Sequence, residues 1–233
     1  MTKKYELVLD DTISFWGWKL FRIRALISFG SVEVGDLGGY IEKEENLSHD
    51  DNAWVSGNAK VWGNAKVWGN AKVWGNAKVW GNAEVWGNAK VWGNAKVWGN
   101  AWVSGNAKVS GNAEVWGNAE VWGNAKVSGN AEVWGNAKVS GNAKVWGNAK
   151  VWGNAEVWGN AKVSELGDII VFKNHWSSSR HFTYTKSNKM WKVGCFYGTG
   201  QELIEKAYRD SEKSGNYYKA YVDFVENLEK LGD

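Results

Sequence analysis

The sequence predicts a mainly β protein: a single-stranded parallel β-helix between a small β-rich N-terminal cap and a small α+β C-terminal domain. A six-residue unit, Gly-Asn-Ala-Lys/Glu-Val-Trp/Ser, repeats without insertion or deletion over residues 51–164. Such a strict period is typical of a solenoid whose repeats stack on one another. The flanks, residues 1–50 and 165–233, lack the repeat, so we expect them to cap its two ends.

Side-chain direction predicts which residues of the unit face inward. Successive strand side chains point to opposite faces, so Ala and Val share one face while Lys or Glu shares the other with Trp. A buried column of unpaired ammonium groups would be prohibitively costly. Ala and Val therefore face inward. We expect Gly to make room for a tight corner, and Asn to adopt the left-handed conformation there and bond to the Asn of the next coil.

The pattern Val-x-Gly-Asn-Ala-x resembles the hexapeptide repeat of left-handed parallel β-helix proteins. In that repeat an aliphatic residue leads each unit and a small residue follows four positions later, as Val61 with Ala65 and Val67 with Ala71 do here. The resemblance implies three units per triangular coil, a left-handed crossover and about six coils in a rod about 30 Å long. Periodicity alone leaves the handedness and the coil length open, because a 12-residue coil sorts the tryptophans about as well as an 18-residue one.

All three segments together resemble an uncharacterised group of phage- and gut-bacterium-associated hexapeptide-repeat proteins. The segments that carry this resemblance are residues 20–26, residues 35–48, the solenoid and residues 194–199. The resemblance implies an architecture and no activity.

With 18 residues per coil, two outward columns of one residue type run along the rod. These are the candidate binding residues. The tryptophan column, on the second face, is Trp62, Trp80, Trp98, Trp116, Trp134 and Trp152, and the lysine column, on the first face, is Lys72, Lys90, Lys108, Lys126, Lys144 and Lys162. On the third face the charge alternates in sign, with Trp102 in the middle.

The outward tryptophans indicate an interaction role. Even half-exposed, they would present more apolar surface than the few hundred Å² that a soluble monomer usually tolerates. We therefore expect a non-enzymatic structural or interaction solenoid that forms a homo-oligomer or binds a protein partner through a tryptophan face. The alternative is a ligand-binding rod for glycans, nucleotides or single-stranded nucleic acid, since indoles stack on bases and sugars and lysines suit phosphates.

An acyltransferase is the second alternative. Many of the β-helix proteins that this repeat resembles are acyltransferases, with a histidine as general base and acyl-coenzyme A along the coils. Residues 51–164 contain no histidine, and their glutamates are spaced as surface charges: Glu84, Glu114, Glu120, Glu132 and Glu156. The residues that this activity needs are missing, so we expect no enzyme, no catalytic residues and no cofactor.

Histidine and cysteine are too few for a closed metal site. The chain has His49, His175, His181 and the single Cys195, whereas a structural zinc site takes four ligands at short spacing. We expect no metal, and we expect Cys195 to be a buried packing residue.

Composition and termini give the expected location. A net charge of +3 is too mild to imply nucleic acid on charge alone. Neither a signal peptide nor an apolar run of about 18 residues is present, so we expect no membrane association. The expected location is the cytoplasm, with the virion or a phage-infected cell as alternatives.

The flanks have their own element pattern. We expect strands at 5–9 and 12–16 around a turn at Asp10 and Asp11, a strand at 20–27, and an irregular first coil with two extra residues between Leu47 and Val55. In the C-terminal flank we expect a hairpin of 180–186 with 189–195, a helix that begins at the Thr199 and Glu202 capping box and ends near 213, and a helix over 216–231. The apolar stripe expected on this last helix is Tyr217, Tyr221, Phe224, Val225 and Leu228.

Overall fold

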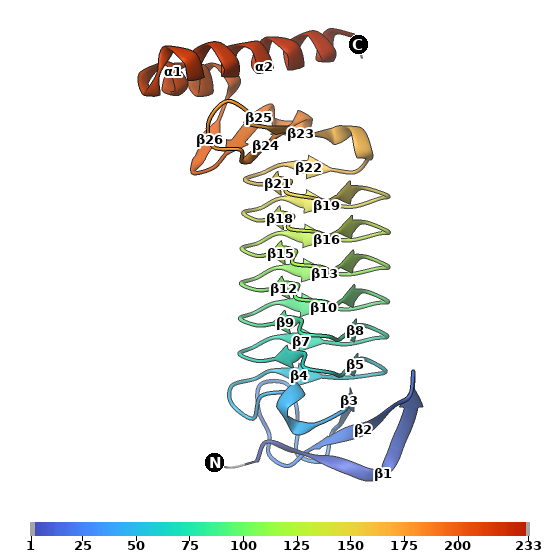
Figure 1. The fold of residues 1–233 in the computed structure, drawn as a ribbon. Helices are drawn as coiled ribbons and strands as arrows, with labels where there is room; N and C mark the ends of the chain where they lie inside the picture. Colours follow the sequence, from blue (N-terminus) through green and yellow to red (C-terminus); the bar gives the residue numbers. More distant parts are fainter. Residues whose placement is uncertain (1–2, 232–233) are drawn as a thin grey trace.

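The computed structural model of the chain, which describes residues 3–231, is a rod with one cap at each end (Figure 1). The rod is a parallel β-solenoid of about seven coils. Its strands are two-residue segments at the charged residue and Val of each unit: β4 Trp54–Val55, β5 Lys60–Val61, β6 Lys66–Val67, β7 Lys72–Val73, β8 Lys78–Val79, β9 Glu84–Val85, β10 Lys90–Val91, β11 Lys96–Val97, β12 Trp102–Val103, β13 Lys108–Val109, β14 Glu114–Val115, β15 Glu120–Val121, β16 Lys126–Val127, β17 Glu132–Val133, β18 Lys138–Val139, β19 Lys144–Val145, β20 Lys150–Val151, β21 Glu156–Val157 and β22 Lys162–Val163.

Strand register establishes an 18-residue coil. Val61 lies beside Val79, and Val67 lies beside Val85, in parallel pairs. Every third strand therefore joins the same sheet, which gives three sheets along the rod. The 12-residue alternative is wrong, and the three-unit coil is confirmed.

The interior is filled by Val and Ala, as side-chain direction predicts. Every repeat Val and Ala has an exposed fraction of 0%. At the corners, Gly takes the left-handed backbone, for example φ +71° at Gly117, and no repeat Asn has a positive φ. The expectation for Asn was wrong because a Cβ on Gly117 would lie 3.0 Å from the backbone nitrogen of Gly135, so only Gly fits this close approach. Asn forms the expected ladder instead: the Asn118 amide donates to Asn136 Oδ1 at 3.0 Å.

The N-terminal cap is a hairpin that continues one sheet of the solenoid. It comprises β1 (Tyr5–Phe15), β2 (Trp18–Ala25) and β3 (Leu37–Ile41), followed by a short 3-10 helix at Glu44–Asn46. The turn predicted at Asp10 and Asp11 was wrong. These residues lie in a bulge of one long strand, because Trp16 and Gly17, both with positive φ, make the turn. Ile41 pairs with Val61, 20 residues on, so the two extra residues of the first coil are confirmed.

The caps complete opposite ends of a directional hydrogen-bond ladder. Each coil donates its N–H groups to the next, as Lys96 N does to Ala113 O at 2.9 Å. The first coil therefore leaves carbonyls unpaired and the last leaves N–H groups, which need partners. The N-terminal cap supplies donors: Lys4 Nζ to Ala53 O at 2.9 Å and Tyr5 Oη to Leu47 O at 2.8 Å. The C-terminal domain supplies acceptors: Thr183 Oγ1 for Glu156 N at 2.9 Å and Ser187 Oγ for Lys162 N at 2.7 Å.

The C-terminal domain is a four-stranded antiparallel sheet with two helices. Its elements are a short 3-10 helix at Leu166–Asp168, β23 Ile169–Lys173, β24 His181–Thr185, a short 3-10 helix at Lys186–Asn188, β25 Met190–Val193, β26 Phe196–Gly198, α1 Gly200–Asp210 and α2 Glu212–Leu231. The predicted hairpin is confirmed as β24 and β25, and Thr199 caps α1 by accepting from Glu202 N at 3.3 Å. No helix within residues 3–231 is long and apolar enough to cross a membrane.

The buried face of α2 differs from the prediction. Gly215, Tyr218, Val222 and Val225 are buried, whereas Phe224 and Leu228 are exposed. The ring of Tyr208 in α1 packs where a Cβ of Gly215 would lie. Gly215 thus allows α2 to approach α1 closely, and Tyr218, Val222 and Val225 pack in the domain core.

Candidate interaction faces

All six tryptophans of the predicted column lie in one stack on the second face. Neighbouring ring centroids from Trp62 to Trp134 are 4.8 to 5.0 Å apart, with interplanar angles of 5° or less. The last step, to Trp152, is 5.5 Å and 14°. The coil thus aligns residues 18 apart into a continuous, offset-stacked aromatic column.

The N-terminal hairpin extends this column with two residues that sequence reasoning missed. Phe15 packs edge-on against Trp62 at 5.4 Å, and Trp16 packs edge-on against both Trp62 and Trp80 at 6.0 Å. Trp62 is therefore only 3% exposed, whereas Trp16 is 66% exposed and Trp152, at the far end, is 42% exposed. The aromatic run Phe15-Trp16-Gly17-Trp18, with a turn-forming Gly inside it, is the sequence signal for this contact.

Charged residues flank the tryptophan column on the same strands. In order along the rod they are Lys60, Lys78, Lys96, Glu114, Glu132 and Lys150. Lys96 Nζ lies 2.7 Å from Glu114 Oε1, and Lys150 Nζ lies 3.6 Å from Glu132 Oε1. Burial and the neighbouring Lys78 lower the pKa of Lys60.

A second tryptophan column, which includes Trp86 and Trp122, lies on the third face, and the ring of Trp102 fills an interruption in it. Its strand position is that of a Lys, and the usual Trp position of this unit is Ser104, which is buried. The Trp102 ring lies 5.0 Å from Trp86 and 5.4 Å from Trp122, in the place that a Trp at 104 would occupy. The column is thus continuous through a unit that lacks its own Trp.

The C-terminal domain covers the end of the third-face tryptophan column. Ser140 is buried, and the ring of Trp158 reaches past it to pack edge-on against Trp122 at 5.6 Å. Lys192 Nζ lies 4.3 Å from the Trp158 ring centroid and 3.4 Å from Glu156 Oε2. This arrangement covers the end of the column with a cation–π contact.

The first face carries the predicted lysine column. All six lysines are in register on adjacent strands. Lys72 Nζ donates to Ser31 Oγ at 3.1 Å, and within residues 3–231 the other five form no ion pair: Lys90, Lys108, Lys126, Lys144 and Lys162. Just after the first two of these strands, Trp74 stacks on Trp92 at 5.0 Å.

Histidine and cysteine have local roles in the caps. His49 stacks on Tyr5 at 4.3 Å, and its Nδ1 accepts from Lys4 N at 3.1 Å. Burial lowers the pKa of Lys4 to about 8 and raises the pKa of Tyr5. Cys195 is exposed, so the expectation of a buried packing cysteine was wrong: it lies in the tight turn after Gly194 that joins β25 to β26. Across residues 3–231 no cluster of three His, Cys, Asp or Glu side chains could hold a metal ion.

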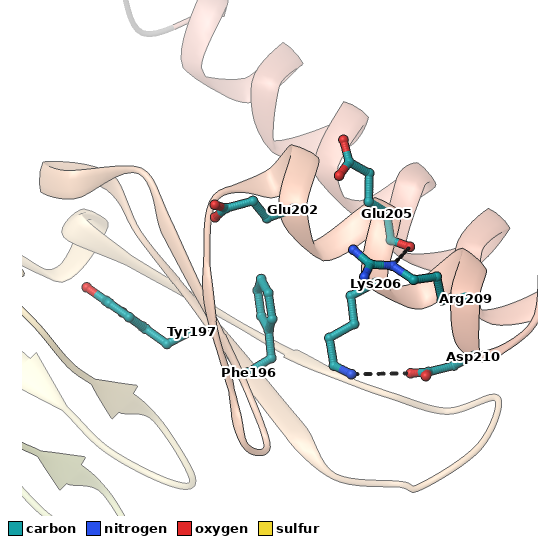
Figure 2. A pocket seen from close by; sticks show the side chains of 7 residues that line it. All are labelled: Phe196, Tyr197, Glu202, Glu205, Lys206, Arg209 and Asp210. Atoms are coloured by element: carbon teal, nitrogen blue, oxygen red, sulfur yellow. Dashed lines mark hydrogen bonds and ion pairs between the residues drawn. The ribbon is translucent and has the colours of Figure 1, made fainter.

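A pocket of about 460 Å³ lies between β26 and α1, and Figure 2 shows its lining side chains. Its charged groups have partners within the domain. Lys206 Nζ lies 4.0 Å from Asp210 Oδ2, and Arg209 Nε donates to the Glu205 carbonyl at 3.4 Å. Glu202 caps α1 through the backbone of Thr199.

Comparison with models of known protein families finds no match, and comparison with curated protein sequences finds none either.

Proposed function

We propose that the protein is a non-enzymatic rod that pairs with a second copy of itself through the tryptophan column of the second face. The observation that carries this proposal is the uninterrupted stack from Trp62 to Trp152, with the exposed indole of Trp152 at one end and the exposed indole of Trp16 packed against Trp62 at the other. A continuous apolar surface of this kind is stabilised when a second surface covers it. The absence of histidine from residues 51–164 supports a non-enzymatic role.

The charge order on the second face fits an antiparallel copy. Consider a two-fold axis that lies in the face and crosses the rod between the coils of Trp98 and Trp116. Like columns then face each other in reverse order, an isologous arrangement. The facing pairs are Lys78 with Glu132, Lys96 with Glu114, and Lys60 with Lys150, each occurring twice by symmetry. Most facing pairs are thus of opposite charge.

The rod ends also match in this arrangement. Trp16 on the hairpin tip of one copy lies toward Trp152 of the other copy, and these are the most exposed indoles of the column. The like-charge pairs, at the two ends of the interface, involve Lys60, whose pKa is already lowered by burial and by Lys78. An antiparallel pair would therefore cover the exposed aromatic surface at both ends.

Sedimentation velocity tests the proposal. The wild-type chain should be a dimer at low micromolar concentration. Trp98→Ser with Trp116→Ser, a replacement that other units carry naturally, should give a monomer. The matched control, Trp74→Ser with Trp92→Ser on the first face, should stay dimeric. A wild-type monomer at about 100 µM, a concentration at which even weak pairs associate, would refute the proposal.

A charge exchange tests the antiparallel register. Lys78→Glu places two glutamates opposite each other across the axis, and Glu132→Lys places two lysines opposite each other. Each single variant should weaken the dimer, and the double variant should restore it. Restoration would not occur in a parallel pair, where each position faces its own copy.

We also propose that the chain is a left-handed member of the hexapeptide-repeat proteins, from the phage- and gut-bacterium-associated group, and acts in the cytoplasm, the virion or a phage-infected cell. The 18-residue coil and the Val and Ala interior support this assignment. An experimental structure with a right-handed crossover would contradict it.

A further inference from the structure

The tryptophan column of the first face is interrupted over two successive coils. Trp74 and Trp92 stack, the next two units carry Ser110 and Ser128, and Trp146 follows. We call Ser110 and Ser128, with Trp92 and Trp146 on either side, the serine gap. No aromatic ring within residues 3–231 stacks on Trp146, which is 37% exposed.

The serine gap differs from the single serines of the third face. There Trp102 fills the place above Ser104, and Trp158 packs past Ser140, so both serines are buried. Ser110 and Ser128 stay partly exposed, and the outward residues two positions before them are Lys108 and Lys126. Aromatic rings thus fill the interruptions of the third-face column, whereas the serine gap of the first face stays unfilled.

The dimensions of the gap suit flat rings. Trp92 and Trp146 are three strand spacings apart, or about 14 Å. Intact columns of this rod place one indole per coil in an offset stack, with centroids 4.8 to 5.0 Å apart. The gap therefore has room for two further aromatic rings in the same stack, one over each serine.

The lysine column indicates, by charge complementarity, that the ligand is an anion. Like charges on neighbouring strands repel each other, and the other two faces relieve this with Glu, as in Lys96 with Glu114 and Lys138 with Glu120. From Lys90 to Lys162 the first face has no acidic residue in the column. A linear polyanion along this column would remove the repulsion.

We propose that the first face binds single-stranded nucleic acid, with two consecutive bases inserted in the serine gap and the backbone phosphates along the lysines. Flat bases stack on aromatic side chains with little sequence preference, and lysines follow the phosphates. The site lies on a different face from the dimer contact, so it stands or falls independently of the proposed function.

Fluorescence anisotropy of a dye-labelled oligothymidylate tests the site in the full-length chain. Filling the gap with Ser110→Trp and Ser128→Trp restores the repeat without removing any lysine. Because stacking contributes about 5- to 150-fold per base, this variant should bind at least tenfold more weakly. The control, Ser110→Ala with Ser128→Ala, keeps the gap and should bind as the wild type does. Equal affinity of the Trp variant and the wild type would overturn the insertion of bases.

Two further comparisons separate the contribution of base stacking to binding from the contribution of charge. Inorganic polyphosphate, which has no rings, should compete at least tenfold less well than the oligonucleotide per phosphate; equal competition would overturn the proposal. Lys126→Glu should weaken oligonucleotide binding several-fold and flatten its salt dependence, whereas Lys66→Glu on the third face, with the same change in net charge, should not. Equal effects of both variants would show that net charge alone attracts the oligonucleotide and would also overturn the proposal.

Discussion

The effects of substitutions at Trp102 and Ser104 on stability should be coupled. The ring of Trp102 occupies the place that a Trp at position 104 would fill in a standard unit. Replacing Trp102 with Lys restores the usual residue of its position but empties the space between Trp86 and Trp122. A half-buried indole covers about 100 Å² of apolar surface, which is about 2.5 kcal/mol at 25 cal/mol per Å². The two lost ring pairs add about 0.5–1.5 kcal/mol each. Since the Lys stem covers part of the space, we expect Trp102→Lys to destabilise the chain by about 2–4 kcal/mol.

The second single variant and the double variant complete the cycle. Ser104→Trp alone places two indoles in one space and should cost about 1–3 kcal/mol through overpacking. Trp102→Lys with Ser104→Trp recreates the standard unit and should lie within about 1 kcal/mol of the wild type. The cycle should thus give a favourable coupling energy of at least about 2 kcal/mol.

Urea unfolding followed by far-UV circular dichroism measures these differences in the free energy of unfolding. This signal is preferable to tryptophan fluorescence because the variants differ in their number of tryptophans. The comparison needs a single transition with a common slope in all four proteins. If the two substitutions are additive, so that the double variant is less stable than either single one, Trp102 does not fill the place above Ser104 and the reasoning fails.

Two further predictions concern the corners and the N-terminal cap. Gly135→Ala and Gly153→Ala both place a side chain at positive φ, but the new Cβ of the first lies 3.0 Å from Gly153 N and that of the second meets nothing within 4 Å. Gly153→Ala should therefore cost about 1–2 kcal/mol and Gly135→Ala clearly more in urea unfolding; equal costs would show that coil contact does not select Gly. Lys4→Met removes a buried donor to Ala53 O and should cost about 1–3 kcal/mol. Because the pKa of Lys4 is lowered from 10.5 to about 8 in the folded chain, the unfolded chain binds more protons between these values, and this group's contribution to stability rises with pH across that window. The stability difference between wild type and Lys4→Met should widen from pH 8 to 10, and a constant difference would contradict the assignment.

The inward and outward positions of the repeat could be predicted well because each obeys one local rule, whereas the conformation expected of Asn was wrong. Alternation and the cost of buried ammonium groups were enough to place Val and Ala inside. The alignment of Trp98 with Trp116 needed the 18-residue coil, which the periodicity alone left open. The contacts that sequence reasoning missed depend on where a side chain leans or where a distant segment folds. The role of Trp102 depends on the rings of Trp86 and Trp122, which lie 16 and 20 positions away in the sequence. Trp16 reaches Trp62 only because the hairpin continues the same sheet. The pairing of Lys4 with Ala53, and of Thr183 with Glu156, follows from the direction of the coil hydrogen bonds, which the residue pattern does not encode.

The uniform interior explains why the three faces can differ. Each coil packs the same Val and Ala residues, all with an exposed fraction of 0%, so an outward substitution leaves the core packing unchanged. The outer positions can then vary column by column: paired charges beside Trp62 to Trp152, a repaired stack around Trp102, and unpaired lysines beside Ser110 and Ser128. A residue that departs from the repeat without a packing partner is therefore the best indicator of a binding role. Ser104 has such a partner in Trp102, whereas Ser110 and Ser128 have none among the described side chains. By this argument the oligonucleotide titration of the Ser110→Trp and Ser128→Trp variant tests the most informative departure in the solenoid.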